Sequence, residues 1–505
     1  MLFKRKTDMN ILLVYPEFPD TFWSFKHALK FVHKKASSPP LGLLTIAGML
    51  PEEWKLRLVD MNVRRLDDPD ICWADFVFLS AMTIQRDSCR DVIARCNQLG
   101  TKIVAGGPLF TTERENFKGI DHFVLNEAEI TLPDFIEDIN KGNPKEVYET
   151  DNHPEIKQSP LPRWDLINFR DYAAMAIQYS RGCPFNCDFC NVTALLGHRM
   201  RVKSADQIIQ ELDGLYEQGW RSGIFFVDDN LIGNKKVLKE DLLPALIDWR
   251  KNKHGISFHT EVSINLADDD ELMNLMARAG FNQVFIGIET PDETNLAECS
   301  KRQNLNRDMV ADVKKIQQAG MRVQGGFIIG FDNDSPSTFQ RLTDFIQQSG
   351  IVTAMVGILQ APIGTILYER MEKAGRLIKN FSGDNVDGST NIIPKMNIDV
   401  LKDNYRKLIR SIYSPELYYK RVMVLLREYK LPDIKSHINF DKFWRNLVAL
   451  IRSIFQLGVF GKERRHYWKL LFWTLFRKPK LLPLAITYSV YGFHFRKISE
   501  QHVAG

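Results

Sequence analysis

The chain has 505 residues, enough for about three domains that each bury a core of their own. Its seven cysteines are odd in number and three lie in one short run, which does not fit a disulfide framework and does fit a reducing cytosol. The net charge of +5 is uneven: residues 401–505 hold 21 Lys and Arg against 7 Asp and Glu, whereas residues 1–400 hold 46 against 55. The basic last fifth therefore has to face an anionic partner, such as membrane phospholipid, nucleic acid or the acidic remainder of the chain.

No stretch reaches about 18 uninterrupted apolar residues, so the sequence predicts no membrane-spanning helix. The basic residues 1–6 are not followed by an apolar segment, so we expect no secretory signal. These observations predict a cytoplasmic protein.

Residues 1–145 alternate between short apolar runs and helical segments. The run 10–15 is apolar and ends at Pro16, which is typical of a buried parallel strand, and residues 87–99 are predicted to be a helix. Further strands are predicted at residues 56–60, 76–80, 102–105 and 122–125. This alternation predicts an α/β, doubly wound, Rossmann-like domain whose ligands lie beyond the carboxyl ends of its strands.

Two of these strand ends carry small residues. Ser80, Met82 and Thr83 lie at one end, and Gly106 and Gly107 follow another. Small residues there let a large flat cofactor approach the backbone. The alternative is a tight strand-to-helix turn, as in any nucleotide-binding type of fold.

A polar, proline-bearing segment over residues 141–165 marks the first boundary, and we assign residues 146–175 to a linker.

The most informative motif is the run RGCPFNCDFC at residues 181–190, in which Cys183, Cys187 and Cys190 have the spacing C-x3-C-x2-C. Three thiolates on one loop can hold three irons of a 4Fe–4S cluster and leave the fourth iron open to a substrate or cofactor. Zinc would need a fourth ligand at a recognisable spacing, and the other four cysteines are scattered. Three buried free thiols, the other alternative, do not predict the neighbouring Gly182 and Phe189.

The run resembles the cluster loop of the radical S-adenosylmethionine (radical SAM) superfamily. The resemblance implies that the amino and carboxylate groups of SAM bind the open iron and that Phe189 lies beside the adenine. Residues 176–371 repeat a strand-helix unit six times, which fits the partial (β/α)6 barrel of that superfamily. Strands are predicted at 177–180, 223–228, 257–263, 283–289, 323–331 and 354–361, and a helix capped by Ser204 at 204–218.

In a barrel of parallel strands, chemistry gathers at the carboxyl ends of the strands. The cysteine run follows the first predicted strand, and polar or glycine-rich segments follow the others. The resemblance therefore implies SAM contacts at these ends, although aspartates also cap helices and glycines also mark bends. The predicted SAM residues are Phe189, Asp228, Asp229, Ser263, Asn265, Glu289, Gly326, Gly330 and Pro362.

The first region also resembles a known domain, the cobalamin-binding domain that often precedes a radical SAM barrel. The likeness rests on the strand ends described above, on the segment PPLG at 39–42 and on the acidic turn of Glu127 and Glu129. The motif D-x-H-x-x-G, which supplies a histidine to cobalt in many cobalamin proteins, is absent. The predicted cobalamin residues are Ser80, Met82, Thr83, Gly106, Gly107 and Glu127.

Residues 372–505 change in character, because the strand pattern ends and 399–429 is predicted to be one helix. Residues 440–495 mix aromatic and basic side chains, as do helices that lie at a membrane surface. We therefore predict a helical domain with peripheral membrane contact through residues 400–500, at the inner face of the membrane. A structural cap on the barrel is one alternative, and nucleic acid is a third that we do not expect.

Nearly the whole chain resembles the cobalamin-binding radical SAM proteins, and the subgroup with the hopanoid methylases most of all. The likeness is carried by PRWD at 162–165, QYSRGC at 178–183 and FVDDN at 226–230. It implies an enzyme that uses a 4Fe–4S cluster, SAM and methylcobalamin to methylate an unactivated carbon of a hydrophobic substrate, with a flavodoxin or ferredoxin as reductant. Two alternatives remain: a non-methylating reaction such as ring formation or oxidation, and a non-catalytic lipid-binding protein that kept the fold.

Overall fold

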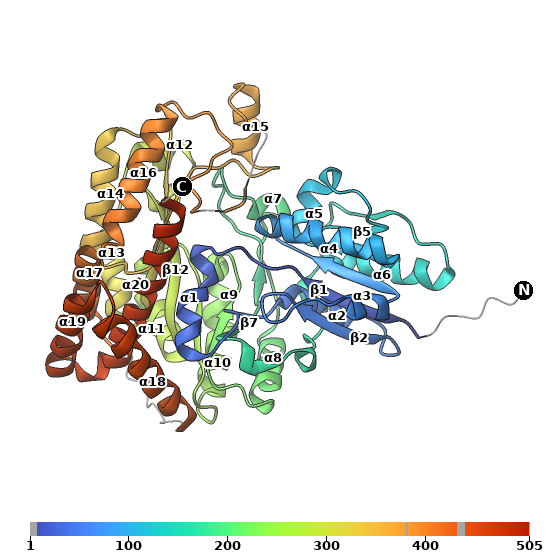
Figure 1. Cartoon of the computed structure of the whole chain (residues 1–505), viewed down its shortest axis with the longest axis horizontal. Helices are drawn as coiled ribbons and strands as arrows, with labels where there is room; N and C mark the ends of the chain where they lie inside the picture. The colour runs from blue at the N-terminus through green and yellow to red at the C-terminus, as the bar shows by residue number, and fades with distance from the viewer. Residues whose placement is uncertain (1–7, 379–381, 385, 432–439, 504–505) are drawn as a thin grey trace, which may run out of the picture.

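The computed structural model describes residues 8–378, 382–384, 386–431 and 440–503, with the backbone alone at 440–446 and 502–503. The start of the predicted first domain and parts of the third lie outside these ranges. Figure 1 shows an N-terminal α/β region at one end, a central region of strands and helices, and C-terminal helices on the far side of the central region.

The N-terminal region is a doubly wound parallel sheet, as predicted. Side chains of its first strand alternate between two buried faces: Ile11 and Leu13 face helices α2 (Leu41–Met49) and α6 (Ala128–Lys141), whereas Leu12 and Val14 face the other layer. That layer consists of α3 (Asp68–Trp73), α4 (Arg86–Leu99) and α5 (Pro108–Glu113). A strand that is apolar at every position is stable only when both faces are covered. The order is β2 (Lys55–Asp60), β1 (Asn10–Tyr15), β3 (Phe76–Ser80), β4 (Lys102–Gly106), β5 (His122–Val124) and β6 (Val147–Tyr148).

The sixth strand, β6, falls in the segment that the sequence assigned to the linker. It pairs in parallel with β5 through Val147 and Tyr148. Two residues are too short an apolar run to be recognised as a strand from sequence.

The central region is a second six-stranded parallel sheet, open between its first and last strands, which confirms a partial barrel. Its order is β14 (Ala354–Ile358), β13 (Arg322–Ile329), β12 (Phe281–Glu289), β11 (Ser257–Glu261), β10 (Gly223–Phe226) and β7 (Ala174–Ile177). Helices α8 (Ala205–Glu217), α10 (Leu243–Trp249), α11 (Asp270–Ala279), α13 (Met309–Gln318) and α14 (Pro336–Ser349) follow successive strands. Ser204 caps α8 by accepting a hydrogen bond from the Gln207 amide, as predicted.

The first barrel strand differs from its predicted bounds of 177–180. β7 ends at Ile177, and Ser180 and Arg181 form β8, which pairs antiparallel with β9 (Arg201–Val202). The chain leaves the barrel there because the buried carboxylate of Asp228 accepts hydrogen bonds from the amides of Tyr179 and Ser180. The side chain of Asp228, which follows the neighbouring strand β10 (Gly223–Phe226), thus takes the place of the backbone hydrogen bonds between the two strands.

The C-terminal region is helical, but the single helix predicted over 399–429 is wrong. The structure has α16 (Ile398–Ile412) and α17 (Pro415–Glu428), separated at Tyr413 and Ser414. Ser414 accepts a hydrogen bond from the Leu417 amide as an N-cap, and Pro415 occupies the first helical position, where its missing N–H is not needed. Among the residues described after position 431, the chain forms α18 (Phe440–Ser453), α19 (Arg464–Arg477) and α20 (Leu482–Val503).

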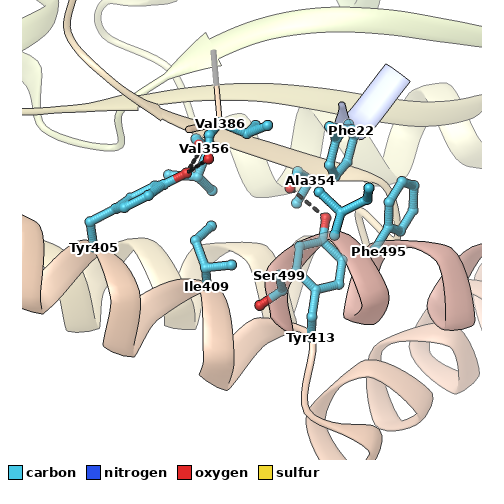
Figure 2. A pocket seen from close by; sticks show the side chains of 10 residues that line it. Phe22, Ala354, Val356, Val386, Tyr405, Ile409, Tyr413, Phe495 and Ser499 are labelled. Atoms are coloured by element: carbon cyan, nitrogen blue, oxygen red, sulfur yellow. Dashed lines mark hydrogen bonds between the residues drawn. The ribbon is translucent and has the colours of Figure 1, made fainter. Parts of the chain in front are cut away.

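The helix α16 covers the free edge of β14. The Tyr413 hydroxyl donates to the Ala354 carbonyl at 2.6 Å, and the Tyr405 hydroxyl is shared between the carbonyls of Val386, at 2.8 Å, and Val356, at 3.2 Å (Figure 2). Edge-strand carbonyls without partners invite pairing with another chain. The tyrosines satisfy them, so the inner faces of the C-terminal helices do act as a structural cap on the barrel.

A segment of the N-terminal region packs far from its own sheet. The ring of Phe22 stacks on Phe495 of α20 with centroids 4.2 Å apart, and both line the small gap seen in Figure 2. Trp23 donates its indole N–H to the sulfur of Met355 on β14 at 2.9 Å. The short helices η1 (Phe22–Ser24), α1 (Lys26–Leu29) and η2 (Lys30–Val32) therefore join the core of the barrel and α20.

Candidate functional site

The cysteine run lies in the loop between β8 and β9, and we call residues 180–202 the cluster hairpin. Gly182 has φ 93°, and a Cβ there would lie 2.6 Å from the Arg199 carbonyl oxygen, so the turn requires glycine. The Cys183 amide donates to the Gly197 carbonyl at 3.3 Å, which closes the base of the loop.

The three thiols are all at least partly buried. Cys187 is buried, while Cys183 and Cys190 are half-buried. Burial raises the pKa of all three thiols, that of Cys190 to about 12, and the ammonium of Lys301 acts in the opposite direction. Thiolates in this environment need additional positive charge, which an iron–sulfur cluster supplies.

The number of donors on the loop bears on the choice between a cluster and zinc. Within the ranges that the structure describes, no three His, Cys, Asp or Glu side chains lie close enough together to hold one metal ion. Each thiolate of a cubane cluster binds a different iron. The three thiols of the loop, Cys183, Cys187 and Cys190, match in number a 4Fe–4S cluster with one iron free of protein ligands.

Two neighbouring aspartates at the end of β10 have different surroundings. Burial raises the pKa of Asp228 to about 7, and its carboxylate accepts hydrogen bonds from the Ser180 hydroxyl and from two backbone amides. It therefore holds the base of the cluster hairpin. Burial also raises the pKa of Asp229, to about 6, and the charge of this carboxylate acts on Cys183 and Cys190. Asp229 is thus placed to face a cation at the cluster.

Ser263 and Asn265 follow β11 and lie beside Asn230. The Ser263 hydroxyl donates to Asn265 Oδ1 at 2.7 Å, and its amide donates to Asn230 Oδ1 at 3.2 Å. The Nδ2 of Asn230 is buried and has no hydrogen-bond partner among the described residues. Buried donors are nearly always paired, so this amide group points to a ligand acceptor.

Glu289, at the end of β12, forms a buried ion pair with Lys301 at 2.7 Å and has φ 64°, the left-handed region. Gly287 leaves room for the pair, because a Cβ there would clash with both side chains. Burial acts to lower the pKa of Lys301, but the charges of Glu289 and Cys187 act in the opposite direction and together more strongly, so the pKa is raised overall. A fixed positive charge therefore lies beside the cysteines.

The other predicted SAM residues differ in their positions: Gly330 and Pro362 follow β13 and β14, Gly326 lies within β13, and Phe189 belongs to the cysteine run. Phe189 packs against the apolar cluster of Cys299 and Phe331, with its ring centroid 5.9 Å from the Lys301 nitrogen. Gly330 has φ 95°, which favours glycine, and Pro362 accepts a hydrogen bond from the Thr365 hydroxyl. The space beside Gly326 is filled, since a Cβ there would lie 2.8 Å from the Phe285 ring.

The sequence did not single out Glu261, on β11. Burial raises the pKa of Glu261 to about 8, and the charges of Asp229 and Asp228 act in the same direction. His259, two residues earlier on the same face, stacks on Phe225 at 4.9 Å, and burial lowers its pKa to about 4. Its place near the carboxyl end of a predicted barrel strand, where chemistry gathers, is the sequence signal that would have found this group.

A cavity of about 340 Å³ lies between the first sheet and the cluster hairpin, a volume at the lower end for ligand sites. Ser80, Gly106, Gly107 and Glu127 line it from the first sheet, as predicted for a cofactor site. A Cβ at Gly106 would lie 2.6 Å from the Val124 carbonyl oxygen, and one at Gly107 would lie 2.6 Å from the Ser80 hydroxyl. The backbone of this wall is therefore packed too closely against its neighbours for any residue but glycine at these two positions.

The structure does not bring Met82 and Thr83 into the cavity wall. Met82 is half exposed, and its amide donates to Gln85 at 2.9 Å in the turn that starts η3 (Thr83–Gln85). Glu127 lines the cavity, but its carboxylate is hydrogen-bonded to Arg181 and Arg201 of the cluster hairpin.

Sequence reasoning missed most of two walls of the cavity. One is α2, of which the segment PPLG at 39–42 indicated only the first two residues, whereas Leu43, Thr45, Ile46 and Met49 also line the cavity. The other comes from the barrel: Gln178, Arg181, Leu195, Leu196 and Val227. No local signal identifies these five, because only the packing of the two sheets places them there.

Comparison with models of protein families matches three consecutive ranges of the chain. The model described as the B12 binding domain matches residues 33–136, and the model of the radical SAM superfamily matches residues 177–346. A domain of unknown function matches residues 365–505.

Two relatives align with almost the whole chain. An uncharacterized methyltransferase of Synechocystis is 37% identical over 97% of this chain and 92% of its own length. The hopanoid C-2 methylase of Rhodopseudomonas palustris is 32% identical over 94% of this chain and 90% of its own length.

Solved structures show the same fold at low sequence identity. The radical SAM methyltransferase TsrM of Kitasatospora setae, with cobalamin and a 4Fe–4S cluster bound, has a TM-score of 0.61 at 14% identity and covers 89% of this chain and 100% of its own. The cobalamin-dependent radical enzyme OxsB, with aqua-cobalamin and SAM bound, has a TM-score of 0.61 at 16% identity and covers 98% of this chain and 80% of its own.

A B12-binding sheet followed by a half-barrel with a three-cysteine loop defines the class of cobalamin-binding radical SAM enzymes. Given the relatives described above, this chain belongs to the cobalamin-dependent radical SAM methyltransferase family. It is an enzyme whose cofactors are a 4Fe–4S cluster, SAM and cobalamin.

Proposed function

We propose that the enzyme transfers a methyl group to an unactivated carbon of a hydrophobic, lipid-like substrate. The observation that carries the proposal is the shared wall between the two cofactor sites: Leu195 and Leu196, at the end of α7 (Val192–Leu196), line the cavity and directly follow the cysteine run. The similarity to a hopanoid C-2 methylase supports a lipid-like substrate.

When bound, the cluster and SAM supply hydrogen-atom abstraction from carbon, and cobalamin supplies the methyl group. The chain itself has to bind and orient these groups. We propose that Cys183, Cys187 and Cys190 bind three irons and that Asp229 accepts hydrogen bonds from the SAM ammonium. Asp228 would hold the loop, as its three hydrogen bonds suggest.

For the rest of SAM, we propose that polar groups at the strand ends bind the ribose and that apolar or backbone groups bind the adenine. The unpaired Nδ2 of Asn230 supports a ligand beside Ser263. The proposed ribose residues are Ser263, Asn265 and Glu289, and the proposed adenine residues are Phe189, Gly326, Gly330 and Pro362.

Anaerobic turnover with methyl-labelled SAM and a hydrophobic polycyclic acceptor tests the reaction. We expect label in an organic product and formation of 5′-deoxyadenosine. Turnover that yields 5′-deoxyadenosine and a changed but unlabelled substrate would favour ring formation or oxidation instead. A flavodoxin or ferredoxin is the proposed electron donor, and leaving it out is expected to stop turnover.

We further propose that the enzyme is cytoplasmic and docks peripherally on an anionic membrane through one face of its C-terminal helices. No helix in the described ranges is long and apolar enough to cross a membrane. Phe460 and Phe476 are 81% and 77% exposed, which is unusual for phenylalanine. We call the exposed apolar residues Phe455, Val459, Phe460, Phe472, Leu475 and Phe476 the docking face.

The docking face combines residues 455–460 with residues of α19. Trp468 stacks on Phe472 with centroids 5.5 Å apart and donates its indole N–H to the Gly458 carbonyl, next to Val459. Residues 447–481 hold eight Lys and Arg and one acid, Glu463, which is buried against Arg496. Exposed aromatics among cations complement an anionic lipid surface, to which each cation contributes about 1 kcal/mol.

Vesicle sedimentation tests this surface. The double variant Phe460→Ser and Phe476→Ser is expected to bind phosphatidylglycerol vesicles at least about tenfold more weakly, because each buried phenylalanine contributes about 1.5–3 kcal/mol. Leu161→Ser, at an exposed apolar residue outside the docking face, is the matched control. Unchanged vesicle binding by the double variant, or binding of the wild type only to an acidic protein, would contradict the proposal.

A further inference from the structure

A buried ion-pair network joins the first sheet to the cluster hairpin. Glu127 Oε2 accepts hydrogen bonds from Arg181 Nη1 and Arg201 Nη1, each at 2.8 Å, and Glu127 Oε1 lies 2.9 Å from His153 Nδ1. Glu129 binds Nη1 and Nη2 of Arg181, each at 2.9 Å, so it shares Nη1 with Glu127. The side chains of Glu127, Glu129 and Arg201 are at most 4% exposed.

The two arginines occupy directly paired positions of the hairpin. Arg181 of β8 lies opposite Arg201 of β9 in the register of the antiparallel pair. Like charges in such positions repel each other and destabilise a strand pair. The carboxylate of Glu127 binds both guanidinium groups at once and offsets this repulsion. The geometry of the hairpin therefore depends on a residue that belongs to the other sheet.

Both ends of the cysteine loop are held by this network. Arg181 is two residues before Cys183, where the loop begins. Arg201 Nη2 donates to the carbonyl of Leu196 at 2.9 Å, and Leu196 ends the short helix that follows Cys190. The hairpin cannot shift relative to the first sheet without breaking these bonds.

The same carboxylates also lie at the cobalamin cavity. Glu127, Glu129 and Arg181 are all in its wall. Every oxygen of Glu127 is hydrogen-bonded to the hairpin or to His153, so this carboxylate is committed to protein groups. Its neighbour Asn126 has φ 61°, so the acidic turn of Glu127 and Glu129 begins with a residue in the left-handed conformation.

We propose that Glu127 is a positioning residue that fixes the distance between the cluster and the cobalamin, and that it is not a ligand of the corrin. The inference rests on the cofactor sites of the proposed function. Glu127 connects the wall of one cofactor site to the base of the other. A displacement of about 1 Å between reacting groups can reduce a rate by about 100-fold.

The test compares Glu127→Gln with Glu137→Gln, a matched control at an exposed glutamate of the same helix, α6. In Glu127→Gln we expect wild-type contents of iron, sulfide and cobalamin. The magnetic interaction between the reduced cluster and cob(II)alamin, measured by electron paramagnetic resonance, is expected to weaken. The yield of methylated product per 5′-deoxyadenosine is expected to fall about 10- to 100-fold, and Glu137→Gln is expected to match the wild type in all of these.

Arg181→Lys keeps the charge but loses the planar fork that joins Glu127 to Glu129, so it carries the test if Glu127→Gln does not fold. An unchanged magnetic interaction in both variants would overturn the proposal. Loss of cobalamin from Glu127→Gln with an unchanged product yield in the remaining holoenzyme would make Glu127 a corrin ligand instead. If the wild type transfers no label, the proposed reaction fails, whereas the magnetic interaction still tests the positioning role.

Discussion

The two sets of strand ends that meet at the cluster hairpin differ in the side chains they carry. Those of the first sheet present glycines, Gly106 and Gly107, and a mostly apolar wall. Those of the barrel present buried ionisable groups, Asp228, Asp229 and the Glu289–Lys301 pair. A large preformed macrocycle requires space, which missing side chains provide. A charged ligand and an iron–sulfur cluster require counter-charges, and these have to be held in place by pairing or hydrogen bonds.

The largest effect is expected at the cluster. Cys187→Ala removes one of three thiolates, so we expect loss of the cluster and of all SAM cleavage, measured as iron and sulfide content and 5′-deoxyadenosine after anaerobic reconstitution. Cobalamin content is expected to stay at the wild-type level, because its cavity lacks this residue. Cys72→Ala, at an exposed cysteine, is the control. Full cleavage by reconstituted Cys187→Ala would refute the assignment.

A change in the first sheet should weaken cobalamin binding and leave SAM cleavage in place, the reverse of Cys187→Ala. Gly107→Ala places a Cβ 2.6 Å from the Ser80 hydroxyl at φ 88°, so we expect cobalamin to bind at least about tenfold more weakly, while SAM cleavage persists. Corrinoid absorbance of the reconstituted protein measures this. Gly100 also has a positive φ, 74°, and a Cβ there meets open space, so Gly100→Ala is the control for an added methyl group at a positive φ without a clash. Equal loss of cobalamin in both variants would argue against a cofactor wall at Gly107.

The role of Asp229 in the SAM site can be tested by measuring the affinity for SAM. Asp229→Asn removes a charge that faces the cluster, and we expect about tenfold weaker SAM binding with the cluster retained, because a hydrogen bond to a charged group contributes about 1.5–3 kcal/mol. Equilibrium dialysis of the reconstituted protein measures the affinity. Asp248→Asn, at a largely exposed aspartate, should leave it unchanged. Wild-type affinity in Asp229→Asn would remove this residue from the SAM site.

The smallest effect concerns the pH dependence of folding in the protein without cofactors. Burial raises the pKa of Glu261 to about 8, so the folded state keeps a proton that the unfolded state has lost. The stability associated with this group is therefore fully present below the unfolded pKa of about 4.3 and is lost as the pH rises through about 8. We expect the melting temperature of Glu261→Gln to fall less than that of the wild type between pH 6 and pH 8.5. Identical pH profiles would show that Glu261 is solvated in the folded protein.

Local patterns predicted much of the fold. The apolar run of β1 and the alternation of strands and helices were sufficient for both sheets except β6, because strand periodicity depends on neighbours in sequence. Prediction failed where a distant group competed with the local pattern. β7 ends early because Asp228 binds the next backbone amides, and the helix predicted over 399–429 is divided at the cap formed by Ser414 and Pro415.

The sequence alone determined the chemistry of the cluster loop, because all three cysteines lie within one short segment, residues 183–190. It also singled out the glycines at one strand end of the first sheet, although the contacts that require glycine there come from Val124 and Ser80 on neighbouring strands. Only the tertiary structure decided which side chains surround the cofactors. The partners of Glu127 lie 54 and 74 residues away, and Phe22 stacks on a residue near the far end of the chain. Such contacts arise from the packing of sheets and helices against each other, which no short-range pattern records.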